Sequence, residues 1–270
     1  MTDERSPGGA GRRGFGVAAT LCDAELRIVS RAAEDAGYAT FWVNDDPDGE
    51  GLAALRAAAD ATSSIRLAVG LIPLDRRTPR QIAARVDALG LPTDRLTIGV
   101  GAGATPGGPS RVRAGVSALR DLTDAQLAVG ALGPRMCQLA ADVADVVLLD
   151  WPTPGHARTQ QSEIERAAAA VERTRPVLAG YVFTALGAAA IQRLESAARH
   201  YAAVPAYAAH FRRIGIDPLE ATVAGTTPTQ ITQGLAAFDD VWEQTVVRAT
   251  VEAETSAAYL RLLTVAAPST

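Results

Sequence analysis

The sequence predicts an α/β fold, a (β/α)8 or TIM barrel, formed as a single domain over residues 14–270. Apolar, strand-like segments alternate with helix-like segments along almost the whole chain, and eight such strands over roughly 250 residues is the number that a TIM barrel needs. The strand-like segments are nearly continuously apolar, as strands covered on both faces should be. The chain has 270 residues, 48% of them hydrophobic, which is enough for one large core. An open, doubly wound sheet is the alternative fold.

Each element follows from a local pattern. The predicted strands are 14–20, 40–45, 65–74, 95–103, 125–131, 145–151, 175–183 and 243–250. The predicted helices are 23–38, 51–64, 78–90, 110–122, 134–144, 157–174 and 254–268, together with an interrupted helical region over 187–238. The signals of a helix start are plainest in the segment 78–90, because Thr78 suits an N-cap and Pro79 suits the first helical position.

Composition argues against several classes of function. A net charge of −4 does not suit nucleic-acid binding, and no apolar run is long enough for a membrane span. Residues 1–13 are polar and glycine-rich, lack the apolar core of a secretory signal, and are predicted to be disordered. Cys22 and Cys137 lack metal or redox spacing and are interpreted as free thiols in a reducing cytoplasm. The histidines are scattered, so no metal site is predicted.

Two glycine-containing junctions could hold an anion. In the segment 131–135, Gly133 and Pro134 stand where a strand hands over to a helix, and the first N–H groups of that helix, those of Arg135 and Met136, favour negative charge. An ordinary strand-to-helix turn with a surface Arg135 is the alternative. In the loop after residue 99, successive glycines can form a nest of N–H groups, and a flexible turn is the alternative there.

Few titratable groups fall at predicted strand ends. Asp45 and Asp46 end the second strand, and because side chains alternate, only one of them should face the barrel mouth. Helix capping near Gly51 is the alternative role for both. Asp150 ends the sixth strand and His156 follows it, so both are candidates for acid–base chemistry. Serine-hydrolase, zinc-protease and Walker motifs are absent from the sequence.

Taken together, four segments resemble the bacterial luciferase-like monooxygenase superfamily, and within it the branch that uses the deazaflavin F420. They read AAEDAGYATFWVND, ATSSIRLAVGLIPLDRRTPRQIA, DRLTIGVGAG and ALGPRMCQLAADVADVVLLDW. The resemblance implies a (β/α)8 barrel with the cofactor at the carboxyl ends of the strands. It also implies an enzyme that transfers a hydride between F420 and a small organic substrate, with an FMN-dependent monooxygenase as the alternative. Members of this family are often homodimers.

The resemblance also assigns residues. It implies a non-prolyl cis peptide or bulge at Gly70-Leu71, behind the cofactor ring, and a polar contact from Asn44 or Asp45. The residues implied to hold the cofactor phosphate are Gly101, Ala102, Gly103, Ala131, Leu132, Gly133, Pro134 and Arg135.

This chain departs from the family pattern at positions that matter for chemistry. Asp46 stands where many F420 reductases carry His, and Ala104 where they carry Glu. Val146 replaces a glycine, and the chain is short beyond the fourth strand. These departures leave the barrel intact but remove the usual proton donor. They also leave open a cofactor-free barrel with a non-redox or binding role.

Overall fold

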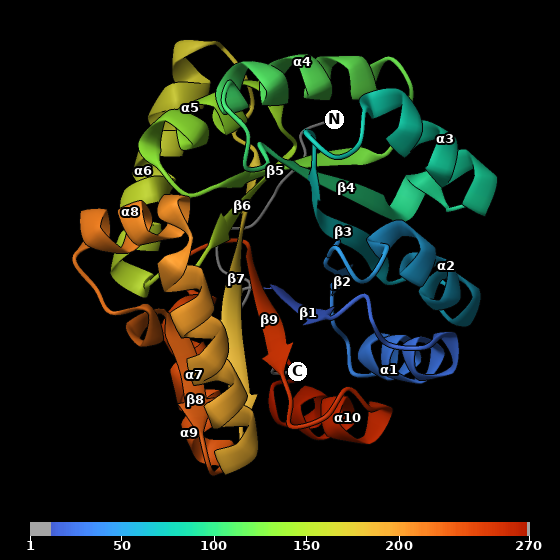
Figure 1. Cartoon of the computed structure of the whole chain (residues 1–270), viewed down its shortest axis with the longest axis vertical. Helices are drawn as coiled ribbons and strands as arrows, with labels where there is room; N and C mark the ends of the chain where they lie inside the picture. Colours follow the sequence, from blue (N-terminus) through green and yellow to red (C-terminus); the bar gives the residue numbers. More distant parts are fainter. Residues whose placement is uncertain (1–11, 269–270) are drawn as a thin grey trace, which may run out of the picture.

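A computed structural model describes residues 12–268, and eight parallel strands close there into a barrel. Figure 1 shows the helices arranged around the strands. The barrel strands are β1 (Arg12–Val17), β2 (Thr40–Val43), β3 (Arg66–Pro73), β4 (Leu96–Gly101), β5 (Gln126–Ala131), β6 (Val146–Asp150), β7 (Val177–Leu186) and β9 (Gln244–Thr250). Strand β9 pairs with both β7 and β1 and so closes the ring. The predicted fold class is confirmed, and β9 is the eighth barrel strand that the sequence predicted.

Helices follow the strands and cover the outside of the barrel. They are α1 (Asp23–Asp35), α2 (Gly51–Ala61), α3 (Pro79–Leu89), α4 (Gly108–Arg120), α5 (Pro134–Val143), α6 (Pro154–Ala170), α7 (Ala188–Ala203), α8 (Pro205–Ile214), α9 (Pro228–Asp239) and α10 (Ser256–Val265). Helix α3 starts with the predicted signals. The Thr78 hydroxyl accepts the N–H of Gln81, the Gln81 side chain accepts the N–H of Thr78, and Pro79 takes the first helical position.

The region between β7 and β9 differs from the predicted interrupted helix. It contains α7, α8, a short strand β8 (Thr222–Gly225) and α9. Strand β8 pairs only with the far end of β7, from Phe183 onward, after the pairing of β7 with β6 has ended at Tyr181. It therefore lies outside the closed ring. Four residues are too few to show a strand period, so the sequence pattern did not reveal this element.

The first strand begins two residues earlier than predicted, because Arg12 and Arg13 belong to β1 rather than to a disordered segment. Residues 1–11 of that segment lie outside the described residues. The buried guanidinium of Arg13 pairs with Asp239 at 2.6 Å and donates to the carbonyls of Ala266 and Ala267 at 3.0 Å. These contacts tie the amino end of β1 to the last two helices.

Cys22 is exposed, Cys137 is buried, and both are free thiols.

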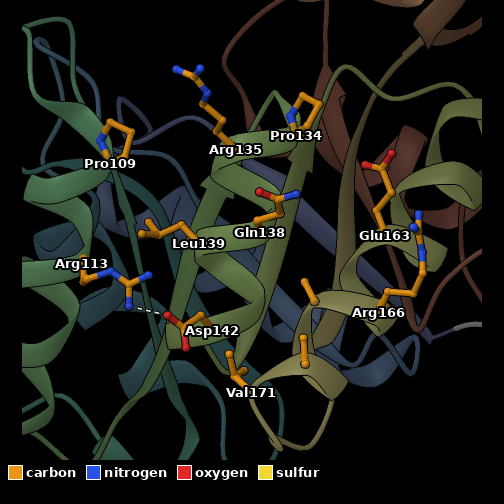
Figure 2. Close-up of a pocket in the computed structure, with 12 residues that line it drawn as sticks. Pro109, Arg113, Pro134, Arg135, Gln138, Leu139, Asp142, Glu163, Arg166 and Val171 are labelled. Atoms are coloured by element: carbon orange, nitrogen blue, oxygen red, sulfur yellow. Dashed lines mark hydrogen bonds and ion pairs between the residues drawn. The ribbon is translucent and has the colours of Figure 1, made fainter.

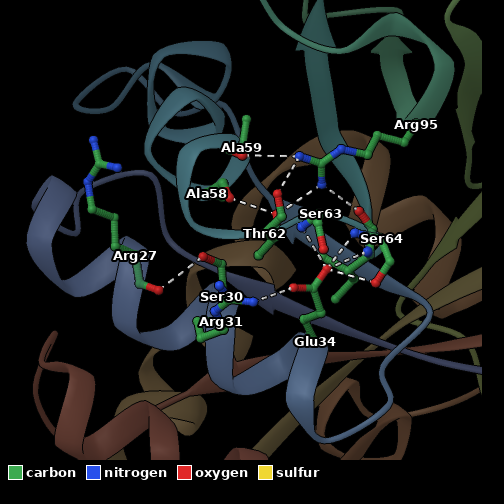
Figure 3. Close-up of polar contacts among 11 residues, drawn as sticks. Arg27, Ser30, Arg31, Glu34, Ala58, Ala59, Thr62, Ser63, Ser64 and Arg95 are labelled. Carbon is green, nitrogen blue, oxygen red and sulfur yellow. Dashed lines mark hydrogen bonds and ion pairs between the residues drawn. The ribbon is translucent and has the colours of Figure 1, made fainter.

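A carboxylate stabilises the amino-terminal end of the barrel, opposite the candidate site. Glu34 Oε1 accepts the N–H groups of Ser63, Ser64 and Ile65 at 2.6–2.9 Å, just before β3 begins (Figure 3). Its other oxygen pairs with Arg31 at 3.0 Å. Partial burial raises the pKa of Glu34, but these N–H donors and the Ser64 hydroxyl outweigh burial and lower it to about 2.

Replacement of Glu34 by glutamine should lower the free energy of unfolding at pH 7 by about 2 kcal/mol. The folded-state pKa lies below the ordinary value of 4.5, so this stabilisation is present above pH 4.5 and is lost as the pH falls toward 2. Urea unfolding at pH 7 and at pH 3 measures both effects. Asp35→Asn, at the exposed neighbouring residue, is the matched control. A loss in Glu34→Gln that is equally large at both pH values would contradict this account.

Candidate active site at the mouth of the barrel

A pocket of about 380 Å³ opens at the carboxyl ends of the strands. It is lined from β9 by Arg248, Ala249 and Thr250, from β7 by Phe183, from α7 by Arg193, Ala197, His200 and Tyr201, and from the loops after β1, β2 and β9 by Ala18, Asn44, Asp46 and Glu254. We call this space the mouth pocket. In a TIM barrel this is the end at which catalytic residues gather, so its position agrees with the general rule for the fold.

Arg248 brings a guanidinium to the mouth pocket, and it was not among the residues expected there from the sequence. One terminal nitrogen donates to Asn44 Oδ1 at 3.0 Å and the other to its neighbour's carbonyl, Ala249 O, at 3.0 Å. The guanidinium carbon lies 5.9 Å from the centre of the Phe183 ring. Within residues 12–268, no carboxylate oxygen lies within 4.0 Å of this guanidinium. The sequence feature that could have revealed it is a single charged residue in the otherwise uncharged strand segment TVVRAT.

The adjacent carboxylates point in different directions, as expected, although β2 ends at Val43 and both lie in the loop after it rather than on the strand. Asp46 lines the mouth pocket and accepts a hydrogen bond from the Asn44 side chain. Asp45 is buried, and its carboxylate accepts the N–H of Gly51 at 3.0 Å at the start of α2. Arg76 lies 3.3 Å from the same carboxylate. The structure therefore places Asp45 in the helix-capping role and leaves Asp46 in the mouth.

Asp150, at the end of β6, lies beneath α8. Its carboxylate accepts the Tyr207 hydroxyl at 2.8 Å and the N–H of Trp151 at 3.1 Å. Burial raises the pKa of Asp150 to about 6, against the opposing effects of these donors and of the Arg248 charge. Asp150 thus holds a proton closer to neutral pH than an ordinary aspartate does.

Aromatic side chains pack above β6 and β7, beside the partly buried Asp150. The Trp151 ring stacks on Phe183, with 4.2 Å between ring centres, and contacts Tyr201 and Phe211. The Tyr201 and Tyr207 rings are 4.7 Å apart. Trp151 therefore packs against the chain's own aromatic side chains above these two strands. Trp42 packs edge-on against Tyr181 inside the barrel.

His156 lies beside the turn after β5 and does not line the mouth pocket. Its ring centre is 5.2 Å from that of His210, on α8. His210 in turn lies 2.8 Å from the carbonyl of Leu132 and 3.3 Å from that of Trp151. Burial lowers the pKa of His156, the nearby His210 and Arg213 act in the same direction, and together they bring the pKa to about 4, so the ring is neutral at pH 7.

The bulge expected at the end of β3 is present. The Gly70–Leu71 peptide is cis, and the pairing of β3 with β4 shifts register between Val69 and Ile72. The Tyr181 hydroxyl donates to the carbonyl of Gly70 at 3.1 Å. The Leu71 side chain lies over Gly130, where an added Cβ would be 2.0 Å from its Cδ1. Part of the small-residue surface at these strand ends is therefore covered by Leu71.

The loop after β4, Gly101 to Gly103, already holds an anion of the chain itself. The Asp75 carboxylate accepts the N–H groups of Ala104 at 2.8 Å and of Thr105 at 3.1 Å. Gly103 has a φ of +73°, and a Cβ there would lie 1.9 Å from an Asp75 oxygen. Partial burial raises the pKa of Asp75, but these N–H groups outweigh it, so the pKa lies below its ordinary value. As it stands, this loop does not fit a phosphate.

The turn between β5 and α5 is better suited to an anion. Gly133 is the N-cap of α5, and Arg135, in the first turn, has an N–H with no intrahelical acceptor. The N–H of Met136, expected to be free, instead donates to the carbonyl of Gly133 at 2.9 Å. Arg213, from α8, donates to the Leu132 carbonyl, and its guanidinium lies 3.3 Å from where a Gly133 Cβ would stand.

A second cavity, of about 700 Å³, lies on the outside of the barrel between α4, α5 and α6 (Figure 2). It begins at Pro134 and Arg135 and descends the outer face of α5 past Leu139. Arg113 pairs with Asp142 across it. None of the acid–base candidates, which are Asp45, Asp46, Asp150 and His156, lines this groove.

Between residues 12 and 268, no group of three or more His, Cys, Asp or Glu side chains is gathered as metal ligands would be. Over the same range, no helix combines the length and the apolar character needed to span a membrane.

Comparison with known proteins agrees with this geometry. The model of the luciferase-like monooxygenase family matches residues 23–108. A search of curated proteins finds no match. The F420-dependent tetrahydromethanopterin reductase of Methanopyrus kandleri is 17% identical, with a TM-score of 0.67 over 94% of this chain and 98% of that one.

Two further solved structures share the fold. An F420-dependent secondary alcohol dehydrogenase, in complex with an F420–acetone adduct, is 13% identical, with a TM-score of 0.74 over 96% of this chain and 99% of that one. The oxygenating constituent of the 3,6-diketocamphane monooxygenase of Pseudomonas putida, in complex with FMN, is 14% identical, with a TM-score of 0.67 over 96% and 97%.

The fold and the mouth pocket define a (β/α)8 barrel that can hold a small molecule at the carboxyl ends of its strands. The family model matches residues 23–108 and the solved structures share the fold, and both agree with the resemblance found in the sequence.

Proposed function

We propose that this protein is an oxidoreductase that transfers a hydride between F420 and a small organic substrate, with FMN-dependent oxygenation as the alternative. The observation that carries the proposal is the mouth pocket, which opens at the carboxyl ends of a luciferase-like barrel. Cofactors of both kinds are bound by proteins with this fold, F420 in the alcohol dehydrogenase and FMN in the diketocamphane monooxygenase. The homodimer and the cytoplasmic location stay predictions.

The residues present fit the phosphate of such a cofactor at one of the two expected positions. The β4 loop is unsuitable because Asp75 takes its N–H groups. At the β5–α5 turn, the donors are the N–H of Arg135 and the guanidinium of Arg213, beside a glycine that admits close approach. When bound, F420 would supply a hydride donor or acceptor, and FMN would supply oxygen chemistry.

Among the carboxylates named from the sequence, Asp46 is the one that lines the mouth pocket, so we assign it the proton-transfer role. Asp150 is held by Tyr207 and lies close to the Arg248 charge, so we assign it a positioning role through the polar groups around it. We assign Asp45 to capping α2, and the neutral His156 to packing against His210.

Titration of the purified protein with F420 and with FMN, followed by fluorescence, tests the proposal. Binding of either cofactor, together with turnover that falls about 100-fold or more in Asp46→Asn, is the expected result. Asp48→Asn, at an exposed residue two positions along, is the matched control. Unchanged turnover in Asp46→Asn would remove Asp46 from the chemistry.

A cofactor-free barrel is the second candidate function, and two observations favour it. Asp75 fills one expected phosphate position, and Leu71 covers part of the glycine surface at the strand ends. Binding of neither F420 nor FMN in the same titration would select this candidate and contradict the oxidoreductase.

A further inference from the structure

Arg248 has unused hydrogen-bonding capacity in the mouth pocket. A guanidinium carries five N–H donors in a fork that suits a carboxylate. Two of these donors are used, one by the Asn44 side chain and one by the Ala249 carbonyl, and both acceptors are neutral. The charge of Arg248 is thus not neutralised by a carboxylate within 4.0 Å in the described part of the chain.

Two of the other charged groups around the pocket neutralise each other, and a third, Asp46, has a neutral partner. Arg193 pairs with Glu254 at 2.9 Å, and Glu254 also accepts the hydroxyl of Tyr259. Asp46 accepts the side-chain N–H of Asn44. His200, also in the lining, adds a ring that can donate a hydrogen bond. In the described part of the chain, Arg248 is therefore the arginine of the pocket without an ion pair, and Asn44 stands between it and the Asp46 carboxylate, which also lacks one.

The remaining walls suit a flat organic group. The Phe183 ring lies below the Arg248 guanidinium, and the Tyr201 ring lies 5.6 Å from Phe183 by ring centres. A volume of about 380 Å³ is in the range of small-molecule sites. An inorganic anion would leave the aromatic wall unused, whereas a planar organic anion would contact both the charge and the rings.

We propose that the mouth pocket binds a small planar organic carboxylate, whose two oxygens face Arg248 and whose body lies against Phe183 and Tyr201. That such a carboxylate is the substrate of the oxidoreductase rests on the proposed function. That the pocket binds such a carboxylate rests on the pocket and its charges alone. Arg248 then determines specificity, because a neutral analogue of the same shape leaves its charge unpaired in a partly buried place.

The test compares 4-fluorobenzoate with 4-fluorobenzamide, which have nearly the same shape and differ in charge. Binding to the protein without added cofactor is followed by the fluorine NMR line width. The wild type should bind the benzoate about tenfold or more tightly than the benzamide, and added salt should weaken only the benzoate. Arg248→Gln should remove this preference, and Arg248→Lys should retain part of it.

Arg27→Gln is the matched control, since Arg27 lies outside the pocket and is paired with Asp60 at 3.0 Å, and it should change the benzoate affinity by less than about threefold. Thermal unfolding of each variant shows that the fold is retained. Equal binding of the two probes by the wild type, no binding of the benzoate, or an unchanged preference in Arg248→Gln would each overturn the proposal. Benzoate preference in a protein that binds neither F420 nor FMN would leave the site standing and reject the oxidoreductase.

Discussion

Alanine at Gly99 is expected to lower the free energy of unfolding by about 3 kcal/mol, because β4 has no room for a side chain there. The added Cβ would lie 2.5 Å from the carbonyl oxygen of Val69 and 3.0 Å from the Leu71 side chain. The first of these neighbours is backbone, so relief requires the end of β3 to move. Urea unfolding measures the loss.

Alanine at Gly130 provides the matched comparison. The three atoms nearest to its Cβ all belong to the Leu71 side chain, the closest at 2.0 Å. We therefore expect Leu71→Ala to rescue Gly130→Ala and to leave most of the Gly99→Ala loss in place, with a coupling of about 1 kcal/mol or more for the first pair. Equal rescue of both glycine variants would show that the Val69 backbone does not limit the strand.

Removal of the Asp75 carboxylate has the second large expected effect. Asp75→Ala frees the N–H groups of Ala104 and Thr105, and should create a site for inorganic phosphate where the wild type offers none. It should also lower the free energy of unfolding by about 2 kcal/mol, since two hydrogen bonds to an ionised group are lost.

Phosphate titration with the backbone amide signals of Ala104 and Thr105 as the readout tests this directly. The variant should show saturable shifts of these signals at millimolar phosphate. Asp48→Ala removes the same charge from an exposed residue and should leave the signals in place. Shifts of equal size in the wild type would mean that phosphate can displace Asp75 and that the β4 loop is an anion site after all.

The barrel was predictable from the sequence because its signals are local. Buried parallel strands are continuously apolar, and the helix between β3 and β4 begins with a capping box that the letters show. The sequence placed Asp45 and Asp46 at the end of a strand, but β2 ends at Val43, so their different directions come from the loop and from the contact of Asp45 with the N–H of Gly51. The register shift behind Gly70-Leu71 came from the family resemblance.

The candidate site was less predictable, because its decisive contacts join distant residues. Asp75 meets the N–H groups of Ala104 and Thr105 across 29 and 30 positions, and Arg213 reaches Leu132 across 81. No spacing rule connects such pairs. The sequence showed two glycine-containing turns as phosphate candidates, and only the tertiary contacts distinguish the turn that carries its own anion from the turn that carries a cation.

The most direct test of the central claim, that the mouth binds a phosphorylated cofactor through the β5–α5 turn, is the F420 and FMN affinity of Arg213→Gln. We predict that the cofactor bound by the wild type is bound about tenfold or more weakly by this variant. Arg212→Gln, at the exposed neighbour, should keep the wild-type affinity within about twofold. Equal affinities in the wild type and Arg213→Gln would contradict the claim.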